Sequence, residues 1–311
     1  MLDLLRDLIF DYTIRNVALG SAILGVIGGA LGSFAVLRRQ GLLGDALAHA
    51  ALPGVCVAFL VFGTKTSAVL LSGAALSAWL GALIILAIVR ETRIKQDAAL
   101  GIVLSVFFGA GVVLLTYIAG SGNAGQSGLD RFIFGQAATL VFEDVVTMGM
   151  LASVALVLVA LFFKEFKLTS FDPAFAASMG FPVGVLNVLL TSLIVVAVIV
   201  GIQVVGVVLM AAMLITPAAA ARQWTDKLSV MIVVSALFGA LSGVTGALIS
   251  ATGSNLPTGP LIVLCATAIL LISLALGKSS GFLWSFLRSR RNRREALRTG
   301  GSPASGRGGA G

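Results

Sequence analysis

The strongest constraint on this chain is a series of long apolar runs. They recur from Val17 to Leu276, and short breaks containing charged residues, Gly, Pro or Ser separate them. Each run has about the 20 residues that an α-helix needs to cross the hydrocarbon core of a bilayer. Of the 311 residues, 58% are hydrophobic and 11% are charged, whereas about 25% are charged in soluble domains. The sequence therefore predicts an all-α, polytopic helical membrane protein.

Nine membrane spans are expected, or eight if one of them is re-entrant. They cover residues 16–37, 43–62, 67–89, 97–119, 143–163, 184–203, 204–221, 227–250 and 260–277. The run from Val183 to Ala221 is nearly unbroken, and it gives two short helices only if it is cut near Gly201 and Gly206. The first span is expected to remain in the protein, because the N-terminus contains acidic residues and lacks a basic region with a cleavage site.

Glycines spaced four residues apart favour close contact between membrane helices. Such pairs are Gly25/Gly29, Gly28/Gly32 and Gly239/Gly243. The two cysteines, Cys56 and Cys265, both lie in apolar runs. They are expected to be packing residues, not a disulfide or a thiolate metal site.

The basic residues predict the orientation of the chain in the membrane. If Arg38 and Arg39 are cytoplasmic, every later basic cluster is cytoplasmic too, as the positive-inside rule requires. These clusters are Arg90/Arg93/Lys95, Lys164/Lys167, Arg222/Lys227 and the C-terminal tail. The N-terminus is then outside and the C-terminus cytoplasmic, and the net charge of +8 needs no nucleic-acid partner. Residues 1–285 form the expected transmembrane domain, and 286–311 form a basic, disordered cytoplasmic tail.

Asp45 and His49, the chain's only histidine, interrupt one of the apolar runs. Residues four apart share a helix face, so both side chains can bind one small ion. At ~1.5 Å per residue, the pair lies roughly 6 to 12 Å inside the hydrocarbon core. Inserting an ionisable residue there costs about 3 kcal/mol, and such residues usually mark an ion path or a proton relay. A carboxylate and an imidazole suit divalent Zn, Mn or Fe.

Two side chains leave a coordination shell incomplete. Pro53 cannot donate a hydrogen bond to the carbonyl of His49, which leaves that oxygen available as a ligand. Other ligands would come from water, other helices or a second subunit. In the alternative interpretation, Asp45 and His49 only hydrogen-bond to each other or to a neighbouring helix.

Several stretches occur in a fixed order along the chain. They are RRQGLLGDALAHAALPGV, DAALGIVLSVFFGAGVVLL, RFIFG, SFDPAFAASMGFPV and VVGVVLMAAMLITPAAAARQW. Together they resemble the permease subunit of the bacterial ABC transporters that import manganese, zinc or iron, over most of the chain from Val17 to Leu276. In this resemblance Asp45 and His49 match positions that contact the passing metal, which is a transported substrate and not a permanently bound cofactor.

The resemblance implies a type II ABC importer permease fold in the bacterial plasma membrane, surrounded by lipid. Two permease subunits, identical or related, would enclose a central path. Two cytoplasmic ABC ATPase subunits would drive transport, and an extracytoplasmic metal-binding protein would deliver the ion.

The stretch FKLTSFDPAFAASMG predicts a short helix between two spans. Ser170 and Asp172 are suitable N-caps, Pro173 suits the first helical position, and Gly180 suits a stop. The charge pattern puts this helix in the cytoplasm, and in the resembling family it is the coupling helix that contacts the ATPase. The residues assigned to this contact are Phe171, Asp172, Ala176 and Gly180.

The function expected is that of a membrane-spanning permease subunit of an ATP-driven importer of divalent metal ions. The chain is not expected to be an enzyme: the stretch GTKTS at Gly63 lacks the glycine spacing of a phosphate-binding loop, and no Ser/His or Cys/His catalytic set is present. One alternative is a proton-coupled secondary transporter in which Asp45 and His49 relay protons. Another is a structural or receptor-like membrane protein in which the pair only holds helices together.

Overall fold

The computed structural model describes residues 12–64, 66–120, 135, 137–252 and 256–277, and all regular structure within these ranges is helical. The basic tail 286–311 lies outside the described residues. The helices are α2 (Tyr12–Leu37), α3 (Leu43–Phe62), α4 (Ser67–Glu91), α5 (Gln96–Gly120), the 3-10 turn η2 (Ala137–Thr139), α7 (Phe142–Leu161), α8 (Phe163–Phe171), α9 (Pro173–Ser178), α10 (Val183–Val205), α11 (Val207–Arg222), α12 (Leu228–Thr252) and α13 (Thr258–Leu276).

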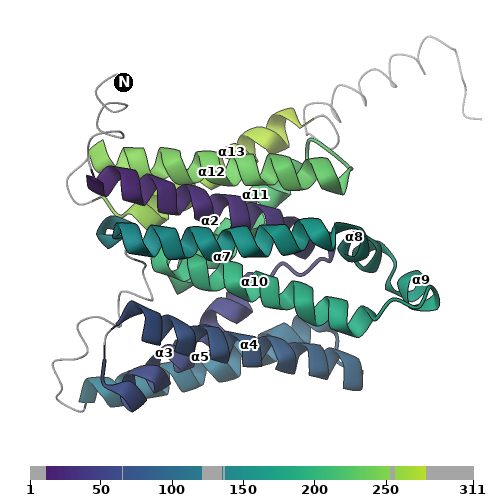
Figure 1. Cartoon of the computed structure of the whole chain (residues 1–311), viewed down its shortest axis with the longest axis horizontal. Helices are drawn as coiled ribbons and strands as arrows, with labels where there is room; N and C mark the ends of the chain where they lie inside the picture. Colours follow the sequence, from purple (N-terminus) through teal and green to yellow (C-terminus); the bar gives the residue numbers. More distant parts are fainter. Residues whose placement is uncertain (1–11, 65, 121–134, 136, 253–255, 278–311) are drawn as a thin grey trace, which may run out of the picture.

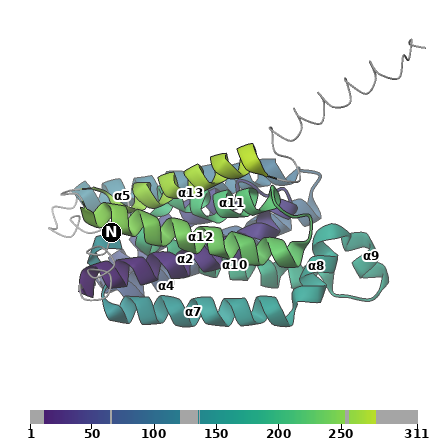
Figure 2. The same ribbon diagram turned by 90° about the horizontal axis from the view of Figure 1, so that it is seen from above.

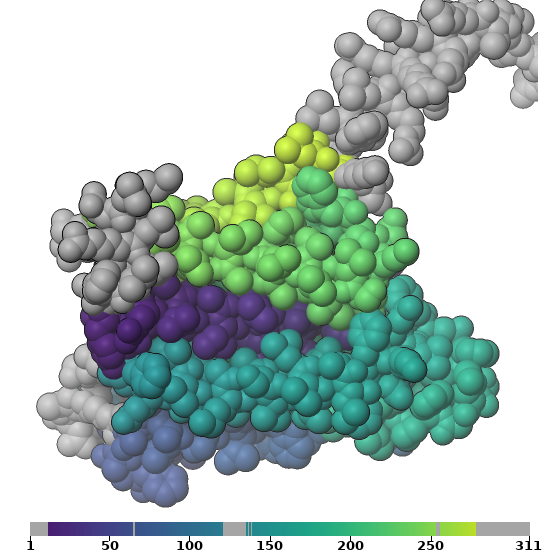
Figure 3. Space-filling view, turned by 45° about the horizontal axis from the view of Figure 1, so that its top comes forward, coloured from purple at the N-terminus to yellow at the C-terminus, as the bar shows by residue number. Residues whose placement is uncertain are grey.

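Helix α2 is the central element of the bundle. It packs against α7, α10, α11 and α12, whereas α3, α4 and α5 pack mainly on one another and form a second group (Figure 1). In Figure 3 the purple surface of α2 is a band between α12 and α7. Leu24, Ile27, Leu31 and Phe34 of α2 are fully buried. A helix that is apolar on all sides is buried in this way because other helices surround it.

Nine apolar helices form the bundle in the part of the chain that the structure describes. Eight described helices are long and apolar enough to span a membrane, and α11 is a shorter apolar helix. Gly206, with a φ of 82°, ends α10, a conformation that glycine adopts without steric cost. Helix α11 then runs beside α13, since Gly259 lies next to Leu209 and Gly277 next to Gln223. Helix α11 thus traverses the same depth as α13, and the expected break in this run occurs at Gly206.

Helices α2 and α12 touch backbone to backbone. A Cβ on Gly25 would overlap the backbone of Gly239, and a Cβ on Gly29 would overlap that of Ser235. The predicted Gly25/Gly29 spacing therefore serves this interface, where small residues let membrane helices approach closely.

The second glycine pair of α2 serves a different interface. Gly28 lies against the carbonyl oxygen of Met213, and Gly32 lies against Leu214 and Ala218 of α11. Residue numbers rise together along both helices, so α2 and α11 run in the same direction. Because α13 is also parallel to α11, the start of α2 and the end of α13 lie at opposite ends of the bundle (Figure 1).

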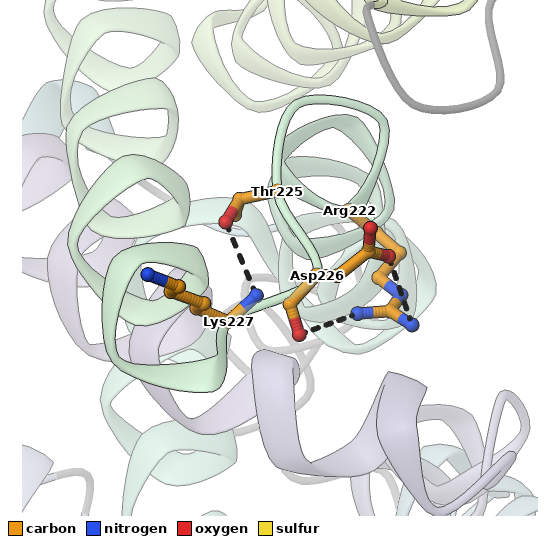
Figure 4. A network of polar contacts seen from close by, with 4 residues as sticks. All are labelled: Arg222, Thr225, Asp226 and Lys227. Carbon is orange, nitrogen blue, oxygen red and sulfur yellow. Dashed lines mark hydrogen bonds and ion pairs between the residues drawn. The ribbon is translucent and has the colours of Figure 1, made fainter.

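Polar contacts fix the short turn between α11 and α12 (Figure 4). Arg222 Nη2 lies 3.5 Å from Asp226 Oδ1, and Arg222 Nη1 donates to the carbonyl of Asp226 at 3.3 Å. The amide of Lys227 donates to Thr225 Oγ1 at 3.2 Å. This turn lies at the same end of the bundle as α8 and α9, which project beyond the long helices (Figure 2).

Candidate functional site

The turn between α2 and α3 determines where the Asp45–His49 pair lies. Arg39 has a left-handed φ of 58°, and the amide of Gln40 donates to the carbonyl of Ala35 at 2.9 Å. This combination is a Schellman cap, which ends a helix and turns the chain sharply. Helix α3 begins three residues later at Leu43 and carries Asp45 in its first turn.

Asp45 and His49 point at one another on the surface of α3. Asp45 Oδ1 and His49 Nε2 are 3.3 Å apart, and the two side chains are 32% and 18% exposed. The ring of Phe108, from α5, meets the imidazole edge to face at 4.8 Å between centroids. His49 Nδ1 is buried and has no hydrogen-bond partner. The imidazole is thus oriented by an aromatic contact on one side and by the carboxylate on the other.

The spacing of this pair is compatible with a shared divalent ion. An ion ~2.1 Å from both atoms would hold them roughly 3.0 Å apart in octahedral and roughly 3.4 Å apart in tetrahedral geometry. The observed 3.3 Å lies between these values. In the part of the chain that the structure describes, no third His, Cys, Asp or Glu joins the pair. An ion held by this pair would have two ligands from these side chains, and its other ligands would have to come from outside this set.

Pro53 continues α3 but leaves the carbonyl of His49 without its intrahelical donor, as expected. Ser77 of α4 donates its hydroxyl to the adjacent carbonyl of Ala50 at 2.7 Å. An apolar cavity of about 540 Å³ begins at Pro53, between α3, α4 and α5. Its lining contains neither residue of the pair, and it offers no charged ligand to an ion.

The short helix α9 has the predicted ends. Asp172 is its N-cap and accepts a hydrogen bond from the amide of Phe175 at 2.9 Å, and Pro173 occupies the first helical turn. Gly180, with a φ of 86°, follows the helix. The predicted role of Ser170 as an N-cap is wrong. Ser170 lies in the last turn of α8, where its hydroxyl donates to the carbonyl of Phe166 at 2.6 Å.

Helix α8 was not expected from the sequence. The predicted span 143–163 ends near the end of α7, and the sequence predicts only one short helix after it, capped by Ser170 or Asp172. Residues 163–171 are also helical because Phe166 is fully buried and meets the ring of Phe34 at 6.0 Å between centroids. This long-range contact leaves no periodic signal in so short a segment.

Residues 163–180 are hereafter called the α8–α9 segment. The apolar side chains that this segment exposes differ in part from the predicted ones. Phe171 is 56% exposed as expected, and Phe175 and Met179 are 51% and 58% exposed. The last two were not expected from the sequence, although their spacing of four residues puts Phe175 and Met179 on one face of a helix that starts at Pro173. Ala176 is fully buried, so it packs inward and cannot form a contact surface for a partner.

Arg38 is a further polar residue that the sequence analysis missed. Its Nε donates to Ser170 Oγ at 2.9 Å, its Nη1 to Asn187 Oδ1 at 2.9 Å and its Nη2 to Thr169 Oγ1 at 3.3 Å. Burial lowers the pKa of Arg38 to about 10, so the guanidinium stays charged at neutral pH. The structure brings together Asp45 with His49, and Arg38 with the α8–α9 segment. Within the described residues, no hydrogen bond or ion pair joins these two sets.

Comparison with known proteins identifies close relatives of this chain. Residues 10–277 match the ABC 3 transport family. The zinc transport system membrane protein TroC of Treponema pallidum (strain Nichols) is 50% identical over 287 residues, which is 92% of this chain and 96% of that protein. The manganese transport system membrane protein MntC of Bacillus subtilis (strain 168) is 51% identical over 282 residues, 91% of this chain and 65% of that protein.

A solved structure has the same fold. PsaBC from Streptococcus pneumoniae, determined in complex with a Fab, matches this chain with a TM-score of 0.78 at 33% sequence identity. The match covers 91% of this chain and 98% of that chain.

Proposed function

This chain belongs to the ABC 3 transport family, and from that premise we propose that it is the membrane-spanning permease subunit of an ATP-driven importer of divalent transition metal ions. Relatives at 50% and 51% identity are named as membrane proteins of zinc and manganese transport systems. The chain is accordingly a transporter subunit and not an enzyme. ATP hydrolysis then belongs to a separate ATPase subunit.

The observation that carries this proposal is the Asp45–His49 pair. Two potential metal ligands face each other at 3.3 Å in an apolar helix, and both remain partly exposed. Because the helices of this chain do not fully cover the pair, an ion path past it lies at the edge of the subunit. A second permease subunit would close this path, and it or water would supply the remaining ligands.

The α8–α9 segment supports the coupling part of the proposal. Phe171, Phe175 and Met179 give a short, capped element an exposed apolar ridge. Large apolar anchors that insert into a partner's pocket dominate many interfaces. We assign this ridge to the ATPase, with Asp172 and Gly180 holding the ends of α9 and Ala176 supporting it from beneath. The metal-binding protein would dock at the opposite end of the bundle.

The proposed location is the bacterial plasma membrane, with the N-terminus outside and the C-terminus in the cytoplasm. The basic clusters at the ends of the apolar runs support this orientation. The opposite positions of the start of α2 and the end of α13 agree with it.

Metal uptake into cells tests the proposal. Cells would express the permease with its ATPase and binding protein, and accumulated manganese, zinc and iron would be measured at equal membrane abundance of each variant. We expect one metal to accumulate with wild type, and Asp45→Ala or His49→Ala to reduce its uptake by about tenfold or more, because each removes an ion ligand. Thr116→Val is the matched control, since the exposed Thr116 hydroxyl bonds only to the carbonyl of Val112 on its own helix.

Variants of similar size distinguish two roles of Asp45 and His49: binding the passing ion, or only bonding to each other within the helix. Asp45→Asn and His49→Gln keep hydrogen-bonding groups in place but weaken metal coordination, so uptake should fall as it does with alanine. Normal uptake by both would show that the pair only links the helix turns. The proton-coupled alternative predicts that uptake continues with an ATPase unable to hydrolyse ATP, whereas an ATP-driven importer stops.

A further inference from the structure

Arg38 connects the central helix to the two elements that flank α9. It follows α2 directly, while Thr169 and Ser170 end α8, and Asn187 lies in the second turn of α10. Three different nitrogen atoms of its guanidinium donate hydrogen bonds to these residues, at 2.9 to 3.3 Å. One planar side chain therefore joins three helices, and the planarity of the group fixes their relative positions.

The hydroxyl partners of Arg38 are themselves held in place. Thr169 Oγ1 donates to the carbonyl of Glu165 at 2.9 Å, and Ser170 Oγ donates to that of Phe166 at 2.6 Å. Each hydroxyl hydrogen is thus used within α8, which leaves the oxygen lone pairs to accept from Arg38. The contact is a preorganised acceptor set and not an incidental surface bond.

An aromatic contact one turn away extends the same interface. Phe34 of α2 and Phe166 of α8 are both fully buried and meet edge to face, at 6.0 Å and 77°. Phe34 precedes Arg38 by four residues, and Phe166 precedes Ser170 by four. The end of α2 and the end of α8 are therefore fixed to each other by two consecutive turns.

Stability alone does not explain Arg38. Among the described residues it forms no ion pair, so its largely desolvated charge has only neutral acceptors. Removing a guanidinium from water is unfavourable, and even a carboxylate partner often only offsets that loss. An aliphatic side chain of similar length would fill the same space without it.

The position of Arg38 along the chain suggests its role. Along the chain, Arg38 is followed by the Schellman-capped turn and the first turn of α3, with Asp45 seven residues later. Its side chain contacts the α8–α9 segment. Arg38 therefore links that segment directly to the turn from which α3 starts.

We propose that Arg38 is a positioning residue that couples movement of the α8–α9 segment to α3 and its Asp45–His49 pair. This inference rests on the proposed function, because it assumes that the α8–α9 segment receives the ATPase. Arg38 does not contact the metal; it transmits the displacement that opens or closes the path.

The test uses the complete importer in proteoliposomes, with manganese or zinc loaded on the binding protein. Metal uptake and ATP hydrolysis are measured in the same vesicles, and their ratio is the readout. We expect Arg38→Met to retain ATP hydrolysis within twofold of wild type while the metal moved per ATP falls at least fivefold. Arg39→Gln is the matched control, since Arg39 is exposed and adjacent in sequence, and its ratio should equal that of wild type.

A double-variant cycle separates coupling from folding. Asn187→Leu cuts the same contact from the other side, so it should lower the ratio in the same way, and Arg38→Met combined with it should lower the ratio no further. If Arg38→Met does not accumulate as folded protein, the metal moved per ATP is measured instead for Asn187→Leu and Ser170→Ala, which keep Arg38 and remove its partners. A wild-type ratio in these variants overturns the inference alone. A wild-type complex that moves no metal overturns the proposed function, and the inference with it.

Discussion

Arg38, Asp45 and His49 follow one another along the α2–α3 turn and the start of α3, and Arg38 and His49 each keep a buried polar group at a cost to the stability of the fold. Arg38 is desolvated with neutral partners only, and His49 Nδ1 is buried without a partner. Buried polar groups with incomplete hydrogen bonding lower stability. Their placement in one short stretch is consistent with residues retained for ion passage and its control.

Arg39 is strained in a way that a single substitution relieves. Its φ of 58° is left-handed, a conformation that costs an L-residue about 1 kcal/mol or more. Arg39→Gly should therefore raise the thermal midpoint of the purified permease by a few degrees, measured by fluorescence-monitored unfolding in detergent. Arg39→Gln removes the same charge but keeps the strain, so it should leave the midpoint unchanged. A lower midpoint for the glycine variant would contradict this account of the turn.

At the scale of the elements, the packing of α2 depends on small residues, whereas α8 and α9 are held in place by a large buried side chain and a helix cap. Helix α2 has glycines where it meets α12 and α11, and the backbones of both neighbours contact these glycines directly. Helices α8 and α9 are too short to be stable alone, and the buried Phe166 and the Asp172 cap hold them. The first arrangement packs the centre of the bundle through backbone contacts, and the second holds a compact element at one end of it.

Close backbone contact between α2 and α12 predicts that Gly25 tolerates no larger residue. Gly25→Ala should destabilise the permease by about 2 to 3 kcal/mol, because the new methyl group overlaps the backbone at Gly239. Gly109→Ala is the control: it lies in α5 with open space at its Cβ position, and its stability should stay within about 1 kcal/mol of wild type. Folded yield and thermal midpoint in detergent measure both, and equal values for the two variants would refute the assigned contact.

The exposed ridge of the α8–α9 segment predicts the ATPase contact. Phe175→Ala should weaken ATPase binding to the permease by about 2 kcal/mol or more, or about 30-fold, as expected for a buried aromatic anchor. Phe142→Ala is matched in residue type and exposure, since Phe142 is 50% exposed at the opposite end of the bundle, and it should bind as wild type does. Binding measured with permease in nanodiscs decides this, and unaltered affinity for Phe175→Ala would remove the ridge from the interface.

For the whole molecule, the separation of the start of α2 from the end of α13 follows from the nine apolar helices of the described residues. It depends on α11, which runs beside α13 along its length despite having only 16 residues. A helix this short spans only part of the hydrocarbon core, and such helices are tolerated where other protein covers their ends. The separation matters because it puts the end of α13 at the same end of the bundle as the α8–α9 segment.

The two caps of α4 report the orientation of the molecule. Thr66 and Thr92 cap its N- and C-terminal ends, so in the proposed orientation Thr66 is outside and Thr92 cytoplasmic. In a background with Cys56 and Cys265 replaced by Ala, Thr66→Cys should react with a membrane-impermeant maleimide on intact cells. Thr92→Cys should react only after the membrane is permeabilised. The opposite labelling pattern would contradict the proposed orientation and show that Thr66 is cytoplasmic and Thr92 is outside.

The sequence by itself determined the features that depend on neighbours along the chain. Run length predicted the spanning helices, a four-residue spacing put Asp45 and His49 on one helix face, and Asp172 was identified as a cap, because helix periodicity and capping involve only adjacent turns. The tertiary structure alone decided the features that depend on distant residues. These include helix α8 with its buried Phe166, the inward position of Ala176, and the bonds from Arg38 to residues more than a hundred positions away. Such contacts follow from which helix faces meet, and uniformly apolar helices carry little sequence signal of that choice.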